Sequence, residues 1–142
     1  MEDFIWSLLN VEIEKGRVMT TRVDAVGKIR MLRELGKLEM PEQMFNRLSP
    51  ALDEIDALRE DRNFIAHGTW GRQRIEMTTI HVCMSLRFKP LNPDEVVSES
   101  VPEGRIRELI DGIERTKWTL IGLQNEYHAL PGKSVPRRYE GS

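Results

Sequence analysis

Residues 42–67 read EQMFNRLSPALDEIDALREDRNFIAH and carry the most regular helical pattern in the chain. The positions that recur in alternating steps of four and three are Met44, Leu48, Ala51, Ile55, Leu58, Arg62 and Ile65. This spacing predicts one face of a long helix, with a guanidinium placed in a row of apolar side chains. Because a charge facing a core is costly unless something negative meets it, Arg62 is expected to reach a cleft, an acid or a ligand phosphate.

Pro50 falls inside this pattern. A proline in a helix interior removes a hydrogen bond and kinks or divides the helix. Ser49 is a natural N-cap, and Asp53 and Glu54 would suit the positive end of a helix dipole. The sequence therefore predicts a break, after which the helix that carries Arg62 runs from about residue 50 to about residue 67.

Three polar side chains converge on the end of this helix. Asn63 and His67 are four residues apart and so share a side of the helix, next to Arg62. Gly68 can adopt the left-handed conformation that ends a helix. Each residue also has an ordinary explanation: His67 as a cation at the negative end of the dipole, Arg62 as an ion-pair partner, and Asn63 as a solvated side chain.

The run Arg62-Asn63-Phe64-Ile65-Ala66-His67, followed by Gly68, resembles the signature of the HEPN (higher eukaryotes and prokaryotes nucleotide-binding) superfamily. That signature is an arginine, a polar residue after it, and a histidine a few residues later. The resemblance covers roughly residues 1–130 in layout but only about seven residues in detail. HEPN domains are small and helical. Many are metal-independent RNases of toxin–antitoxin, abortive-infection or CRISPR systems, and others are binding modules.

The resemblance implies a metal-independent endoribonuclease, such as the toxin of a toxin–antitoxin or phage-defence system, with no cofactor. His67 titrates near neutral pH and can act as general acid or base. Arg62 presents a planar fork of donors that can stabilise the phosphate. Asn63 can hold the hydroxyl, the phosphate or the histidine ring. The resemblance also implies a homodimer, with two motifs side by side in one cleft, and a cognate antitoxin as a further partner.

Three arginines flank the motif and could form a local RNA-binding patch: Arg59, Arg72 and Arg74. Ordinary solvated surface explains them equally well. The net charge of -2 gives no general attraction for nucleic acid. Two alternatives therefore stay open: a non-catalytic HEPN-like module that binds RNA, a nucleotide or a protein, and an unrelated helical interaction protein.

Length and composition set the wider limits. A chain of 142 residues is expected to form one domain, here residues 1–130, with a disordered tail at 131–142. The single cysteine, Cys83, excludes an intrachain disulfide, and nothing suggests a metal site. No apolar run is long enough for a membrane span, and the chain opens with acidic residues. A cytoplasmic protein is expected.

Three further helices are expected. The first covers about residues 2–15 and stops at Gly16, the second runs from an N-cap at Thr20 or Thr21 to about residue 38, and the last covers about residues 102–129. Residues expected to face inward on the last helix are Ile106, Leu109, Ile110, Ile113, Leu120 and Ile121, with Trp118 and Tyr127 beside them. Trp6 lies off the main stripe of the first helix, either at the rim of the core or in contact with a second protomer.

Period-two alternation over residues 80–88 predicts a strand. Together with the alternation at 74–77 it predicts a β-hairpin over about residues 70–89, followed by a loop at 90–101. His81 is interpreted as a solvent-facing strand residue. The fold class is therefore mainly α: an up-and-down bundle of four or five helices with a β-hairpin insertion.

Overall fold

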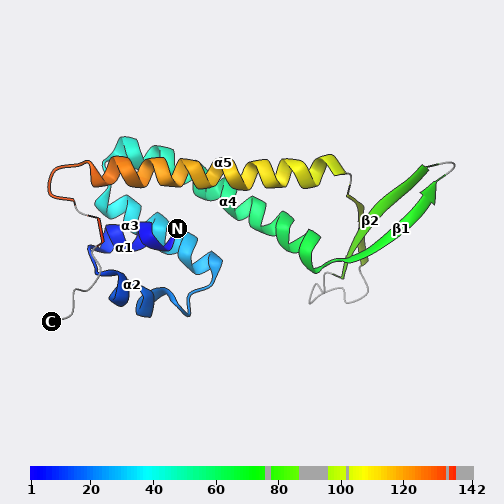
Figure 1. Cartoon of the computed structure of the whole chain (residues 1–142), viewed down its shortest axis with the longest axis horizontal. Helices are drawn as coiled ribbons and strands as arrows, with labels where there is room; N and C mark the ends of the chain where they lie inside the picture. Colours follow the sequence, from blue (N-terminus) through cyan, green and yellow to red (C-terminus); the bar gives the residue numbers. More distant parts are fainter. Residues whose placement is uncertain (76–77, 87–95, 102, 134, 137–142) are drawn as a thin grey trace. The chain divides into compact units, whose positions relative to one another are not determined.

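The computed structural model describes residues 1–75, 78–86, 96–101, 103–133 and 135–136 (Figure 1). The protein is mainly α, as predicted. The described residues form five helices: α1 (Glu2–Leu9), α2 (Ile13–Thr20), α3 (Ala25–Glu39), α4 (Glu42–His67) and α5 (Glu103–His128). Three strands lie between α4 and α5: β1 (Thr69–Ile75), β2 (Thr78–Leu86) and β3 (Val96–Ser100). None of the helices in these ranges has the length and hydropathy needed to cross a bilayer.

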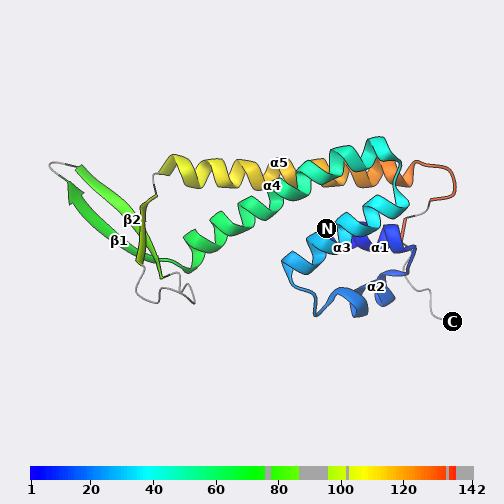
Figure 2. The same cartoon turned by 180° about the vertical axis from the view of Figure 1, so that it is seen from behind.

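The chain divides into two compact units. The first unit is Met1–Asp56 with Arg115–Ser142, and the second unit is Ala57–Glu114. Helices α4 and α5, which Figure 2 labels as seen from behind, each contribute one part to either unit. Because their halves have different neighbours, one helix can bury different sides along its length.

The first unit holds the larger core. Its buried side chains are Phe4, Ile5, Trp6, Leu8, Ile29, Leu32, Met40, Met44, Leu48, Leu52, Leu120, Leu123 and Tyr127. They come from α1, α3, α4 and α5 and, for Met40, from the turn between α3 and α4, so segments far apart in the sequence meet there. Burying apolar side chains in this way stabilises the fold by about 1.5–3 kcal/mol for each large residue.

The predicted helix at 2–15 is two helices. Asn10 ends α1 in the left-handed conformation (φ 51°, ψ 45°), and its N–H donates to Ser7 O at 3.1 Å. Asparagine is one of the few residues that tolerates this conformation. Gly16, expected to stop the helix, instead lies inside α2.

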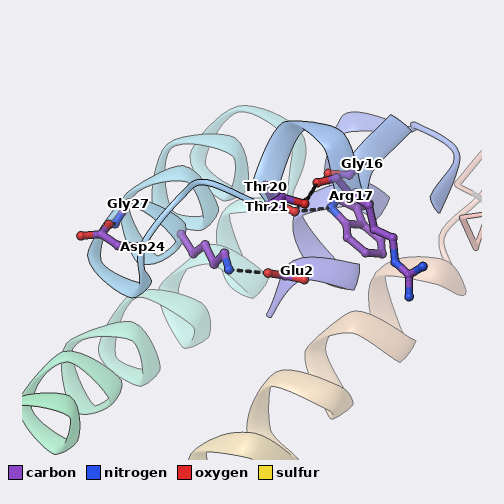
Figure 3. A network of polar contacts seen from close by, with 9 residues as sticks. Glu2, Gly16, Arg17, Thr20, Thr21, Asp24 and Gly27 are labelled. Carbon is purple, nitrogen blue, oxygen red and sulfur yellow. Dashed lines mark hydrogen bonds and ion pairs between the residues drawn. The ribbon is translucent and has the colours of Figure 1, made fainter. Parts of the chain in front are cut away.

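Gly16 is where α2 approaches the indole of Trp6. A Cβ on Gly16 would lie 2.5 Å from Trp6 Cδ1 and 2.7 Å from Cδ2, so only glycine fits beneath the ring. Trp6 Nε1 donates to Thr20 Oγ1 at 3.2 Å, and Thr20 Oγ1 donates to Gly16 O at 3.0 Å (Figure 3). Trp6 is only 4% exposed, so it belongs to the core of one chain and not to its rim.

The predicted N-cap of the following helix is also corrected. Thr20 and Thr21 lie at the end of α2, and Asp24 caps α3 by accepting from Gly27 N at 2.7 Å (Figure 3). An aspartate satisfies a free N–H at a helix start as well as a threonine does, so the local sequence allowed either.

The predicted break at Pro50 is wrong, because α4 continues through it. An interior proline costs about 3 kcal/mol. Leu48 and Leu52, one on either side, are 0% exposed and together contribute about 3–6 kcal/mol by burial. Pro50 itself is exposed, so its ring displaces no core atoms. Ser49 does not cap a helix but accepts from Arg33 Nη1 at 2.9 Å.

The three strands form one antiparallel sheet in the order β1-β2-β3. Thr69 pairs with Met84 and Ile75 with Thr78, while Val82 pairs with Ser100. The hairpin expected at about 70–89 falls in this region, with residues 76–77 and 87–89 outside the described ranges. The prediction of a loop at 90–101 is wrong for residues 96–100. These residues form β3, which pairs with the edge of β2 that β1 does not occupy. Residues 90–95 lie outside the described ranges.

Helix α5 buries fewer residues than its pattern predicts. Leu109 and Leu120 are buried as expected, and so is Tyr127. Ile110 is 53% exposed, Ile113 43% and Trp118 63%, so the interior position expected for these three is wrong. The inward side of α5 was predicted for a helix with one continuous core along its whole length, whereas α5 packs in two separate units.

Two polar contacts tie α5 into the first unit. Arg47 donates to Glu126 through both Nη atoms, at 2.6 and 2.9 Å, and this hydrogen bonding lowers the pKa of Glu126. His128 Nε2 lies 2.8 Å from the buried Ser7 Oγ. Since the hydroxyl of Ser7 donates to Asp3 O at 2.7 Å, the serine oxygen accepts and His128 donates. Burial lowers the pKa of His128.

The expected disordered tail at 131–142 is described only in part. Lys133 Nζ lies 3.2 Å from Glu39 Oε2 and 5.1 Å from the centroid of the Tyr127 ring. These contacts tie the first residues after α5 to the first unit. Residue 134 and residues 137–142 lie outside the described ranges.

Candidate functional site

The end of α4 is held from one side by the segment around the start of α5. Phe64 is 7% exposed and Val101 is 2% exposed, and Ile65 and Ile106 pack against them. This small cluster belongs to the second unit and fixes which side of α4 faces inward there. The opposite side must then face solvent.

One arginine reinforces this packing. Arg105 Nη2 donates to Asp61 Oδ1 at 2.9 Å, and the guanidinium carbon of Arg105 lies 5.8 Å from the centroid of the Phe64 ring. The contact therefore combines an ion pair with a cation–π interaction. A Cβ on Gly112 would lie 2.8 Å from Leu58 Cδ2, so α5 runs close to α4 at this point.

The motif residues lie on the solvent side of α4. With about 100° between successive residues, Arg62, Asn63 and His67 fall within an arc of about 140°, which also includes Arg59 and Ala66. Arg62, Ala66 and His67 are exposed, and Asn63 is half-buried. The structure thus brings together all three residues expected to be catalytic, together with one arginine of the expected patch.

Arg62 does not face a core, so this part of the sequence interpretation is wrong. In the first unit α4 buries Met44, Leu48 and Leu52, whereas in the second unit it buries Phe64. Leu58 and Ile65, the neighbours of Arg62 in the apolar row, are half-buried in the second unit, whereas Arg62 itself is exposed. Arg62 Nη1 donates to Asn63 Oδ1 at 3.2 Å, so the two polar groups already form a pair.

His67 is the last residue of α4 and its ring is exposed. It makes no hydrogen bond or ion pair with another described residue, so both ring nitrogens are open to a ligand. Gly68 N donates to Phe64 O at 3.0 Å, and the chain then enters β1 directly. Gly68 does not adopt the left-handed conformation that its position suggested; among the described glycines only Gly132 has a positive φ.

A side chain that sequence reasoning did not single out closes this helix end. Trp70 Nε1 donates to Ile65 O at 2.9 Å, which satisfies a carbonyl of the last turn. Trp70 is 43% exposed. The sequence did hold one indication that Trp70 has a special role. It lies three residues after His67, between Thr69 and Gly71, and belongs to no apolar pattern that would place it in a core.

The arginines expected to bind RNA are placed unevenly. Arg59 lies on the same arc of α4 as Asn63, and its Nη2 is 3.7 Å from Glu60 Oε1. Arg72 is exposed in β1. Arg74 also lies in β1, but its side chain is not described. No group of three histidine, cysteine or acidic side chains that could hold a metal ion occurs in the described part of the chain.

A guanidinium, an amide and an imidazole lie within two turns of one exposed helix face. Groups of this kind can donate to phosphate oxygens, and an imidazole can accept or donate a proton. Comparison of the chain with protein-family models, with curated proteins and with solved structures finds no match.

Proposed function

We propose that the protein is a metal-independent endoribonuclease of the HEPN type. The observation that carries this proposal is the shared, solvent-exposed face of Arg62, Asn63 and His67 at the end of α4, with Arg62 already hydrogen-bonded to Asn63 at 3.2 Å. The same three residues carry the resemblance to the HEPN signature. A phosphodiester laid along this face would meet the guanidinium and the imidazole together.

The reaction is an internal transesterification. The 2′-oxygen of a ribose forms a bond to the neighbouring phosphorus, and the bond from phosphorus to the 5′-oxygen breaks. His67 takes the proton from the 2′-hydroxyl or gives a proton to the departing 5′-oxygen. Arg62 stabilises the charge that develops on the non-bridging oxygens. Asn63 keeps the guanidinium in place, as its hydrogen bond to Arg62 suggests.

Assembly is the next part of the proposal. One chain offers a single histidine on this face, whereas the reaction needs one proton to be removed and one to be supplied. A homodimer with two motifs in one cleft would provide the second group, and the second unit would then belong to the interface. The proposal also includes an up-and-down arrangement of the helices and a cognate antitoxin that holds the enzyme inactive.

A non-catalytic binding module is the second candidate. The observation that favours it is the net charge of -2, which suits a binding module better than a nuclease that attacks RNA in general. In this case the exposed face would bind a phosphate group without cleaving it.

The test is cleavage by wild type and by His67→Ala, with total RNA and EDTA present. A general acid or base contributes about 10²–10⁴-fold to the rate, so the variant should show almost no cleavage. An exposed histidine at a helix end contributes about 1 kcal/mol or less to stability, so the melting curves should nearly coincide. EDTA removes contaminating metal-dependent nucleases from the result.

Matched arginine variants complete the experiment. Arg62→Ala should lose cleavage, whereas Arg30→Ala, which removes an equally exposed arginine from α3 in the first unit, should retain it. If His67→Ala cleaves as fast as wild type, the role assigned to His67 is wrong. If wild type binds RNA but leaves it intact, the binding module becomes the better description.

A further inference from the structure

Trp70 is a large aromatic side chain held rigidly at the surface. Its Nε1–H donates to Ile65 O at 2.9 Å, yet 43% of the residue remains exposed. Exposing an indole costs hydrophobic free energy that a smaller residue would avoid. The hydrogen bond explains why the ring is fixed, but it does not explain why so much of the ring faces water.

The segment of chain that carries Trp70 is basic. The stretch 62–75 contains three arginines and one histidine and has no aspartate or glutamate. Trp70 and Arg72 are two residues apart in β1 and therefore lie on the same face of the strand. His67 precedes Trp70 by three residues, so their Cα atoms are at most about 11 Å apart. An exposed ring thus lies between the candidate catalytic residues and a further arginine.

We propose that Trp70 is a stacking platform for a base of single-stranded RNA next to the scissile phosphate. This inference rests on the proposed ribonuclease function and specifies its substrate. A base that stacks on the indole would place the adjoining phosphates within reach of Arg62 on one side and Arg72 on the other. Basic side chains that follow the backbone and aromatic rings that hold the bases are the usual combination in proteins that bind single strands.

The hydrogen bond of Trp70 also determines what kind of recognition is possible. Because Nε1–H is already donated to Ile65 O, the ring has no polar group left to read the edge of a base. Only its face is available, and every base has a face. Binding should therefore depend little on sequence but strongly on strandedness, since both faces of a base are covered by its neighbours in a duplex.

Two substitutions separate stacking from capping. Trp70→Phe and Trp70→Leu both remove the N–H that bonds Ile65 O, so both lose the cap equally. Only Trp70→Phe keeps an aromatic face. The probe is a fluorescein-labelled 2′-O-methyl RNA of mixed sequence and about 12 nucleotides, within the range of single-strand site sizes. It lacks the attacking hydroxyl, so wild-type protein binds it without cleaving it, and fluorescence anisotropy gives Kd.

The expected result is a loss of affinity for Trp70→Leu of about 5- to 150-fold, the fold-change equivalent to about 1–3 kcal/mol per stacked base. Trp70→Phe should stay within about threefold of wild type. A probe of the same length in which every nucleotide is abasic should abolish the difference between the two variants. The same sequence as a duplex should bind weakly to all three proteins.

Other outcomes overturn the proposal in distinct ways. Equal losses for both variants assign Trp70 to capping alone, and unchanged affinity in both shows that no base stacks there. Failure of wild type to bind the probe also rejects stacking. Cleavage of unmodified RNA is measured in parallel, so a protein that cleaves RNA without dependence on Trp70 retains its proposed function while losing this substrate assignment.

Discussion

Replacing Gly16 by alanine should destabilise the protein even though alanine is the better helix former. Gly16 lies inside α2, where the exchange alone would gain about 1 kcal/mol. The new Cβ would, however, lie 2.5 Å from Trp6 Cδ1 and 2.7 Å from Cδ2, distances that real Cβ atoms do not show. The indole is 4% exposed and has no space into which it can move without disturbing the core.

The magnitude follows from the displaced contacts. Overpacking of a core costs about 1–3 kcal/mol. Loss of the 3.2 Å hydrogen bond from Trp6 to Thr20 adds about 0.5–1.5 kcal/mol. After subtraction of the helix-propensity gain, the net loss is about 0.5–3.5 kcal/mol. For a chain of this size that corresponds to a decrease in Tm of about 2–12 °C.

The assay is thermal unfolding followed by far-UV circular dichroism and by tryptophan emission. The control is Gly122→Ala in α5, because Gly122 is also inside a helix of the first unit but has no atom within 4 Å of its added Cβ. That variant should gain about 0.5–1 kcal/mol. If Gly16→Ala is stabilised as much as Gly122→Ala, the indole does not lie over Gly16 and the packing argument for α1 and α2 fails.

Three further changes test other parts of the structure. Burial lowers the pKa of His128, so as the pH falls the unfolded chain takes up the proton before the folded chain does. The free energy of unfolding should therefore decrease as the pH drops below about 6.5. Urea unfolding at about pH 7.5 and pH 5.5 should show this decrease in wild type and a smaller one in His128→Gln. Arg105→Ala removes the partner of Asp61 and the cation over Phe64, so amides at the end of α4 should exchange hydrogen faster while those of α1 are unchanged. Pro50→Ala restores a helical N–H on an exposed side and should raise stability by about 1–2 kcal/mol in chemical denaturation; a loss instead would show that the proline ring packs.

The sequence predicts helices well where periodicity is strong and poorly where local signals compete with packing. Helical periodicity was found over about residues 42–67 and α4 spans Glu42–His67, but the break expected at Pro50 would have started the helix of Arg62 at about residue 50. Pro50 and Gly16 were interpreted as breaks because each weakens an isolated helix. Neither ends one here, since buried leucines on both sides of Pro50 and the indole against Gly16 determine the structure. Such contacts join residues that are distant in sequence, and a local pattern cannot reveal them.

The candidate site was found in part. The spacing of Asn63 and His67 correctly placed both on one side of α4. The direction in which Arg62 points was wrong, because the spacing was extended along a helix that has different neighbours in each unit. Trp70 was missed, because its role depends on a bond back to Ile65 O that no motif records. For both Arg62 and Trp70, the sequence does not tell which residues lie next to the side chain.

The buried Phe64 imposes a condition on the motif beside it. Phe64 packs with Val101 in the small cluster of the second unit. A helix turns by about 100° per residue, so the number of residues between Phe64 and Arg62 sets the direction in which the arginine points. Removal of Asn63 would turn Arg62 by about 100° relative to Phe64. The exposed position of Arg62 therefore depends on its two-residue spacing from Phe64 as much as on the arginine itself.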